Sequence, residues 1–154
     1  AAASGVFDVI GHPDVIKGFG ARMGAEARPG GARDAGRGGG RGQRRRGFSG
    51  DVSGEPRLTL AGYYDALVSA ASASGTCLEV SSAGLRRPVG EVYPAMGLLR
   101  LARERGVAIT LASDAHEPEE VGSRYDELAE WARTAGYRTI TVFDGRIPRQ
   151  VEMG

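Results

Sequence analysis

The sequence has one cysteine and two histidines in 154 residues, and Lys17 is its only lysine. The single cysteine, Cys77, excludes an internal disulfide and any zinc or redox site built on a Cys-x-x-Cys pair. No apolar run approaches the ~18 residues that span a bilayer, and residues 1–5 lack the basic start of a signal peptide. The composition therefore predicts a soluble, cytoplasmic protein with no membrane partner.

Glycine and arginine, by contrast, are abundant, and both concentrate in one segment. Residues 18–57 contain 13 of the 25 glycines, and nine basic against four acidic residues give this segment a net charge of +5. Residues 30–47 include no Val, Ile, Leu or aromatic residue, so they cannot bury apolar area to offset their ordering entropy. We predict one domain over residues 1–154, with a flexible insert at 18–57 and a core at 6–17 and 58–148.

The core alternates short apolar runs with helical patterns, which is typical of parallel strands buried on both faces. The predicted strands are residues 6–10, 77–80, 107–112 and 139–143. Apolar residues at helical spacing predict helices from Leu60 to Ala71, from Val92 to Ala102 and from Val121 to Ala132, each followed by a glycine. The order of elements predicts an α/β fold made of parallel βα units.

Both histidines directly follow predicted strands. His12 comes after the first strand, and Asp114 and His116 come after the third. In parallel α/β folds, functional groups gather beyond the carboxyl ends of the strands. If the strand geometry continues, Asp114 and His116 point the same way. A carboxylate and an imidazole suit zinc, iron or manganese, so these three residues are candidate metal ligands.

Each candidate also has an ordinary structural interpretation. Ser113 and Asp114 can cap the following helix, with His116 on the surface, and for a lone DxH pair capping is the more common role. His12, which precedes a proline, can be a hydrogen-bonded turn residue. Three ligands are too few for a closed catalytic centre by themselves.

The arginines fall into two groups. Arg86 and Arg87 follow the second strand, where a guanidinium could clamp a phosphate bidentately, although a solvated loop arginine is the plainer interpretation. Residues 41–46 resemble a basic arm that binds nucleic acid. Only Phe48 lies near this arm to stack on bases, so a solvated loop is favoured there too.

Four motifs stand in order along the chain: residues 7–14 (FDVIGHPD), 78–88 (LEVSSAGLRRP), 91–94 (EVYP) and 113–116 (SDAH). Together they resemble the PHP (polymerase and histidinol phosphatase) superfamily. The GLRRP and EVYP pair, with SDAH followed by Val121-Gly122, is most similar to the histidinol-phosphatases of histidine biosynthesis. The resemblance covers residues 6–17 and roughly 58–148.

This resemblance implies the C-terminal part of a distorted (β/α)7 barrel, with divalent metal ions (Zn, Mn or Fe) at the carboxyl ends of its strands. It implies hydrolysis of a phosphomonoester, L-histidinol phosphate, to L-histidinol and phosphate. His12 matches a metal ligand of the family, and Asp114 and His116 match its final ligands and are the expected catalytic residues. Arg86 is the candidate phosphate contact, whereas Glu79 matches a family position without being assigned as a metal ligand.

Members of the family begin with an HxH motif and further ligands that residues 1–154 do not contain. The chain resembles a C-terminal half, so two hypotheses stand beside each other. Either it works as a metal-dependent phosphatase, or it is inactive until a partner chain or an N-terminal half supplies the missing ligands. A third hypothesis, nucleic-acid binding through residues 28–47, predicts binding that falls steeply with salt.

Overall fold

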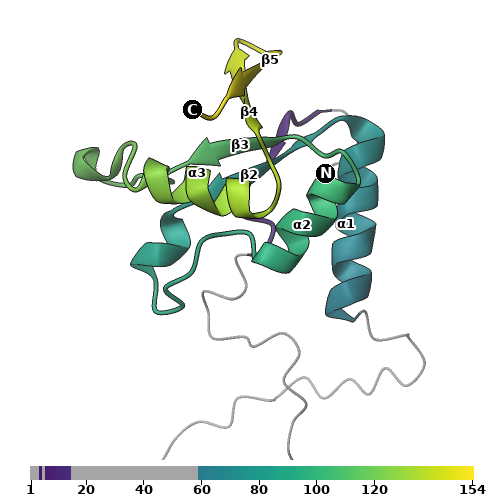
Figure 1. Cartoon of the computed structure of the whole chain (residues 1–154), viewed down its shortest axis with the longest axis horizontal. Coiled ribbons are helices and arrows are strands. Elements are labelled where there is room, and N and C mark those ends of the chain that lie inside the picture. Colours follow the sequence, from purple (N-terminus) through teal and green to yellow (C-terminus); the bar gives the residue numbers. More distant parts are fainter. Residues whose placement is uncertain (1–3, 5, 15–58) are drawn as a thin grey trace, which may run out of the picture.

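The structure is a computed structural model that describes residues 4, 6–14 and 59–154, so the predicted insert at 18–57 lies outside the described residues. Helices and strands alternate through most of the described chain (Figure 1). In chain order the elements are β1 (Val9–Ile10), α1 (Leu60–Ser74), β2 (Cys77–Ser81), the 3-10 helix η3 (Ala83–Arg86), α2 (Met96–Glu104), β3 (Ile109–Ala112), the 3-10 helix η4 (Pro118–Glu120), α3 (Tyr125–Thr134), β4 (Thr139–Asp144) and β5 (Ile147–Glu152).

The first three strands form a parallel sheet in the order β1-β2-β3, which confirms parallel pairing for this part of the prediction. Strand β2 lies between the other two, and four of its five residues are buried. Strand β1 is shorter than the predicted run at 6–10, and its register pairs Ile10 with Leu78. All three strands therefore end at the same edge of the sheet, and the loops that follow them meet there.

The fourth predicted strand forms, but its predicted parallel pairing is wrong. Strand β4 pairs antiparallel with β5, an element absent from the prediction, in a separate two-stranded sheet. Gly145, with φ 60°, occupies the first position of the two-residue turn between them, where a positive φ is required. The hairpin extends away from the parallel sheet in Figure 1. Pro148 is tolerated because β5 pairs only with β4 and so is an edge strand.

Helix α1 follows the sequence pattern closely. Its apolar stripe buries Val68 and Ala71, the Thr59 hydroxyl accepts the N–H of Gly62 at its start, and Gly75 ends it with φ 67°. These are the polar N-cap and left-handed C-cap that satisfy the free backbone groups at helix ends. None of the helices in the described part of the chain is long and apolar enough to cross a membrane.

Helix α2 begins a full turn later than predicted. Val92 is buried, as its place in the stripe suggested, but it lies in an extended segment where Tyr93 bridges antiparallel to Ser81. The residue before a proline avoids helical backbone angles, and Pro94 follows Tyr93. The Asp14 carboxylate accepts the N–H of Ala95 at 2.7 Å, which ties the loop after β1 to the start of the helix.

Helix α3 also begins late, because the chain between residues 118 and 125 is interrupted. Gly122 and Arg124 both have left-handed backbone angles, with φ 71° and 61°, so η4 and α3 cannot form one continuous helix. Val121, predicted to lie on the buried stripe, is 74% exposed. The stripe of α3 instead buries Leu128 and Ala132.

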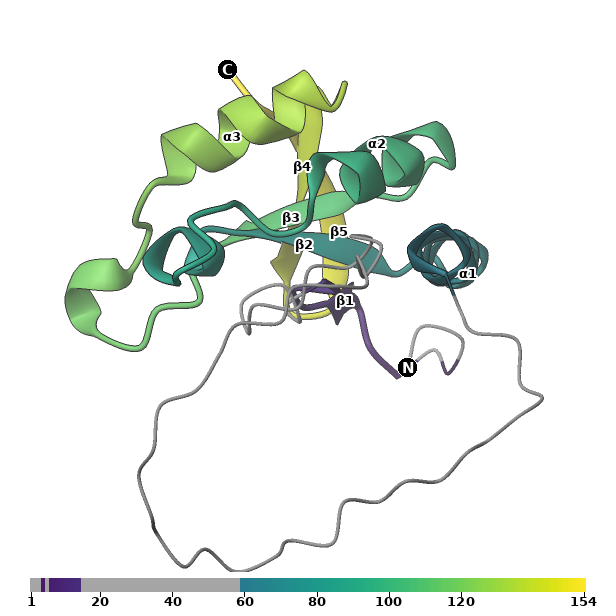
Figure 2. The same cartoon turned by 90° about the horizontal axis from the view of Figure 1, so that it is seen from below.

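Helices α2 and α3 lie over the same face of β2 and β3, with α1 beside α2 (Figure 2). The core fills the space between these helices and the strands. A fully buried leucine or valine contributes ~1.5–3 kcal/mol relative to an exposed one, so this layer supplies most of the driving force for folding. Its fully or almost fully buried members include Val68, Leu78, Val80, Leu98, Leu99, Ile109 and Leu128.

Candidate functional site

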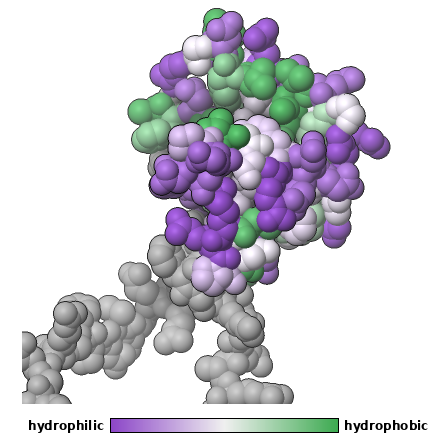
Figure 3. Space-filling model, turned by 90° about the vertical axis from the view of Figure 1, so that its left-hand side faces the viewer, coloured by the Kyte–Doolittle hydropathy of each residue, from purple (hydrophilic) through white to green (hydrophobic). Residues whose placement is uncertain are grey.

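The loops after β1, β2 and β3 bring polar side chains from distant parts of the sequence to one edge of the sheet. Figure 3 views the molecule from the side toward which β3 points in Figure 1, and hydrophilic side chains cover much of it. His12 follows β1, Glu79 lies in β2, and Asp114 follows β3. These three side chains therefore lie on the side of the sheet where functional groups were expected.

The imidazole of His12 lies between two carboxylates. Its Nδ1 is 2.7 Å from Oε1 of Glu79, and its Nε2 is 3.9 Å from Oδ2 of Asp114. An ionised carboxylate only accepts hydrogen bonds, so the contact with Glu79 places a proton on Nδ1. In the neutral ring, the lone pair is then on Nε2 and faces Asp114. Glu79, which our sequence analysis left without a role, therefore orients the His12 ring.

Asp114 and His116 do not share the strand geometry expected of them. Strand β3 ends at Ala112, and Asp114 has φ 50°, a left-handed angle that few residues other than glycine adopt. The Asp114 carboxylate turns toward His12, whereas Nδ1 of the His116 ring lies 2.9 Å from the backbone oxygen of Asp114. That carbonyl is also only an acceptor, so Nε2 of a neutral His116 ring keeps its lone pair.

The capping alternative is wrong for Ser113 and Asp114, although His116 is exposed, as that alternative expected. The N-cap residues of η4 and α3 are Glu117 and Arg124, and neither makes a side-chain capping hydrogen bond. The Ser113 hydroxyl instead accepts the N–H of Gly122, nine residues along the chain. The Ser82 hydroxyl donates to the backbone oxygen of Ser123 at 3.0 Å. These two hydroxyls hold the segment between η4 and α3 against the ends of β2 and β3.

The donor atoms at this edge fit part of a metal site. An imidazole nitrogen and a carboxylate oxygen are ordinary ligands for zinc, manganese and iron. Two ligands at ~2.0–2.2 Å from one zinc ion lie at most ~4.4 Å apart, and Nε2 of His12 is 3.9 Å from Oδ2 of Asp114. Within the described residues, however, no three His, Cys, Asp or Glu side chains are grouped to hold an ion. His12 and Asp114 thus form a pair, and the ligand role of His116 stays a prediction.

Arg86 is engaged by protein groups on one side of its guanidinium. Its Nη2 donates to the backbone oxygens of Ser113 and Asp114, each at 2.8 Å, and its Nε is 3.0 Å from Oε1 of Glu120. A bidentate clamp on phosphate through Nε and Nη2 would displace these partners. Among the described residues only Nη1 has no recorded partner, so a phosphate contact through Arg86 is restricted to that end.

Glu120 completes this arrangement with its second oxygen, which accepts the backbone N–H of His116 at 2.9 Å. That hydrogen bond, together with the positive charge of Arg86, holds the pKa of the Glu120 carboxyl below its usual value despite partial burial. The contact between Glu120 and Arg86 joins the segment after β2 to the segment after β3.

Two comparisons with known proteins bear on this site. A family model described as PHP-associated matches residues 98–135, which run from α2 through Asp114 and His116 into α3. The probable histidinol-phosphatase of Deinococcus radiodurans is 33% identical over 141 residues, or 92% of this chain. The chain covers 41% of the length of that relative.

Both matches support a relationship of this chain to the PHP superfamily. The chain is histidinol-phosphatase-like and corresponds to the C-terminal portion of such a protein, which confirms the resemblance found in the motifs. The matched range includes Asp114, His116 and Glu120, whereas His12, Glu79 and Arg86 lie outside it. The candidate site therefore combines residues inside the matched range with residues outside it.

Sequence reasoning missed two contacts of the candidate site, that of Glu79 with His12 and that of Glu120 with Arg86 and His116. For Glu79 a signal was present, because a carboxylate within the buried run of β2 needs a partner to offset its desolvation. For Glu120 there was no such signal, since it is one of several acidic residues near a helix start, where acids are common. Cys77 is buried, and this burial raises the pKa of its thiol, which disfavours the reactive thiolate.

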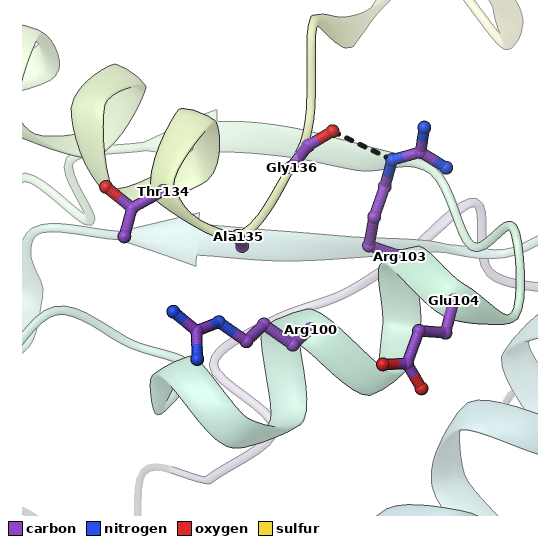
Figure 4. Close-up of a pocket in the computed structure, with 6 residues that line it drawn as sticks. All are labelled: Arg100, Arg103, Glu104, Thr134, Ala135 and Gly136. Atoms are coloured by element: carbon purple, nitrogen blue, oxygen red, sulfur yellow. Dashed lines mark hydrogen bonds between the residues drawn. The ribbon is translucent and has the colours of Figure 1, made fainter.

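A pocket lies away from the candidate site, between the carboxyl ends of α2 and α3. Arg103 reaches across it to donate to the backbone oxygen of Gly136 at 2.9 Å (Figure 4). These helix ends precede the starts of β3 and β4, so the pocket is at the opposite edge of the sheet from His12 and Asp114. None of the predicted site residues lines it.

Proposed function

We propose that this chain is part of a metal-dependent phosphomonoesterase that hydrolyses L-histidinol phosphate to L-histidinol and phosphate. The observation that carries the proposal is the His12 ring held between the carboxylates of Glu79 and Asp114 at the carboxyl edge of the parallel strands. The 33% identity to a probable histidinol-phosphatase supports the choice of substrate. In this proposal the β1-β2-β3 sheet belongs to a distorted (β/α)7 barrel in a cytoplasmic enzyme.

The proposed metal-holding atoms are Nε2 of His12 and Oδ2 of Asp114, with Nε2 of His116 as the third. Zinc, manganese and iron all accept this set of donors. A bound divalent ion supplies Lewis-acid chemistry, which offsets the charge of the phosphate oxygens and makes water a stronger nucleophile at neutral pH. We expect the remaining ligands to come from an N-terminal half or a partner chain.

The other residues of the edge act on these ligands and on the phosphate. Glu79 holds the proton of His12 on Nδ1 and so fixes the orientation of the ring, as carboxylates do for many metal-binding histidines. Arg86 offers Nη1 to a phosphate oxygen while its other nitrogens stay bound to the loop after β3. A phosphate monoester would be attracted to this guanidinium by charge and oriented by its hydrogen bonds.

The test is to combine residues 1–154 with an N-terminal half that carries an HxH motif and to measure phosphate release from L-histidinol phosphate with Mn²⁺. We expect metal-dependent release that His116→Ala abolishes. The Arg100→Gln variant, changed at the opposite edge of the sheet, is the control and keeps full activity. Full activity in His116→Ala would contradict the assignment.

A second candidate is that residues 1–154 alone have no activity. The specific observation in its favour is that the described residues group no three metal-binding side chains. Phosphate release by residues 1–154 alone, assayed with Mn²⁺ and with Zn²⁺, separates the two candidates. Robust turnover without an added half would reject this one.

The nucleic-acid hypothesis concerns residues 28–47, which lie outside the described residues, so it stays a prediction. It is tested by retention on nucleic acid at rising salt, with and without residues 28–47. Binding that is unaffected by the deletion would remove it.

A further inference from the structure

The carboxylate of Glu120 bridges the two loops that carry Arg86 and His116. Its Oε1 lies 3.0 Å from Nε of Arg86, and its Oε2 accepts the backbone N–H of His116 at 2.9 Å. Both are charge-assisted contacts, which are stronger than hydrogen bonds between neutral groups. The Glu120 side chain is only 27% exposed, so solvent weakens these contacts less than it would on an open surface.

Arg86 closes the arrangement into a ring around the backbone after β3. Its Nη2 donates to the backbone oxygens of Ser113 and Asp114, and the Glu120 carboxylate accepts the backbone N–H of His116. The backbone of Asp114, which has the left-handed φ of 50°, is thus held at its own carbonyl by Arg86 and two residues further on by Glu120. Such an angle is costly for a residue with a side chain, and it persists only where the surroundings fix it.

We propose that Glu120 is a positioning residue, which holds the Asp114 peptide and the His116 backbone in the geometry that directs the Asp114 carboxylate toward His12. This inference rests on the proposed function, because it assigns Glu120 to the support of the proposed metal ligands. Glu120 does not touch the metal or the substrate itself. Its effect passes through Arg86 and through the backbone of His116.

The variant Glu120→Gln keeps the size of the side chain but removes its ability to accept two hydrogen bonds. One end of the amide is a donor, so it would face either Nε of Arg86 or the N–H of His116 with like polarity. Glu120→Asp is the second variant, which keeps the charge but is one methylene too short to reach both partners. Glu119→Gln is the matched control, because it makes the same charge change at the neighbouring exposed position of η4.

Three quantities are measured on the full chain completed with an N-terminal half that carries an HxH motif: hydrogen exchange of the His116 amide, the affinity for Mn²⁺, and the Tm. In Glu120→Gln we expect about tenfold faster exchange at His116 and about tenfold weaker Mn²⁺ binding, the lower end of the loss seen when supporting groups of metal ligands are removed. Glu120→Asp changes both in the same direction. Glu119→Gln changes neither, and the Tm of all three variants stays close to that of the unchanged chain.

Unchanged exchange at His116 in both Glu120 variants would overturn the inference. Faster exchange with unchanged Mn²⁺ affinity would overturn it as well, because Glu120 would then hold the loop without setting the ligands. Failure of the unchanged chain, completed with the N-terminal half, to bind Mn²⁺ would count against the proposed function instead. In that case the exchange rate at His116, measured without added metal, still decides whether Glu120 holds this loop.

Discussion

The two edges of the parallel sheet both carry arginine and glutamate side chains, yet they differ in how those side chains are arranged. At the carboxyl edge, His12 follows β1 and pairs with two carboxylates, that of Glu79 in β2 and that of Asp114 after β3. At the opposite edge, Arg103 lines a pocket but binds the carbonyl end of α3 and lies over the ring of Tyr137, with its Cζ 5.8 Å from the ring centroid.

The difference shows that a hollow lined by charged residues is not by itself a functional site. The contacts of Arg103 complete a helix end and cover an aromatic ring, both of which stabilise the fold. The contacts of His12 leave a nitrogen lone pair directed at a carboxylate, which is an arrangement suited to binding an ion. The four predictions below test whether the edges divide in this way, from the largest expected effect to the smallest.

The largest effect is expected from Asp114→Asn. The amide lacks the negative charge with which a carboxylate binds a divalent ion. Phosphate release by the enzyme completed with an N-terminal half should therefore fall more than about 100-fold, beyond the loss that supporting residues give. The measurement is kcat/KM for L-histidinol phosphate at saturating Mn²⁺. Activity within a few-fold of the unchanged enzyme would place the metal ligands elsewhere.

Glu79→Gln should have a smaller effect on the same edge. The amide can still accept from Nδ1 of His12, but it no longer strengthens the ring as a ligand, so the Mn²⁺ affinity of the chain should fall about 10–100-fold. Titration calorimetry measures this affinity directly. Glu104→Gln, which removes the same charge beside the opposite pocket, should leave it unchanged. Equal losses in the two variants would mean that only net charge matters.

At the opposite edge, Arg103→Ala should affect stability without affecting metal binding. The variant loses a hydrogen bond to Gly136 and the cation–π contact with Tyr137, so its free energy of unfolding should fall by about 1 kcal/mol. Urea unfolding measures the loss, and Arg100→Ala, in the same pocket, is the control. A drop in Mn²⁺ affinity in Arg103→Ala would break the division between the edges.

The smallest effect concerns Tyr137, whose hydroxyl donates to the backbone oxygen of Val107. Burial raises the pKa of this tyrosine above its ordinary value of 10.0. The unfolded chain therefore loses the tyrosine proton at a lower pH than the folded chain, and stability present below about pH 10 is lost as the pH rises further.

In the unchanged chain the free energy of unfolding should decrease between about pH 9 and pH 11, and the Tyr137→Phe variant should show a smaller decrease. The comparison is with Tyr125→Phe, which removes an exposed tyrosine and should leave the pH dependence nearly unchanged. Identical pH dependence in the two variants would show that Tyr137 is not held protonated by burial.

Much of the parallel part of the fold could be predicted from the sequence, because periodicity and burial coincide there. Helix α1 and strand β2 are examples, and both have sharp end signals. The start of α2 was placed too early, since Val92 is buried without being helical and a hydrophobic pattern does not distinguish the two cases. Pro94 was the signal in the sequence for a later start. Strand β5 was missed because Pro148 and two charged residues interrupt its apolar alternation.

The sequence supplied candidates for the site, but neither their geometry nor the contributions of Glu79 and Glu120. Placement after strands was enough to select His12, Asp114 and His116. The left-handed angle of Asp114 separates its carboxylate from the His116 ring, and no residue type in the sequence signals that angle. The role of Glu79 depends on a contact with His12, which is 67 residues away in the sequence. The role of Glu120 depends on a hydrogen bond from the backbone N–H of His116, which no residue type signals.

The central claim is that His12 binds a metal ion through Nε2 while Glu79 holds the proton on Nδ1. The chain has only two histidines, so a ¹⁵N–¹H correlation spectrum of its imidazole rings, recorded before and after addition of Zn²⁺, reports on each ring separately. The account predicts a His12 ring protonated at Nδ1, whose Nε2 resonance shifts when zinc is added. A His12 ring protonated at Nε2, or one whose resonances do not respond to zinc, would contradict it.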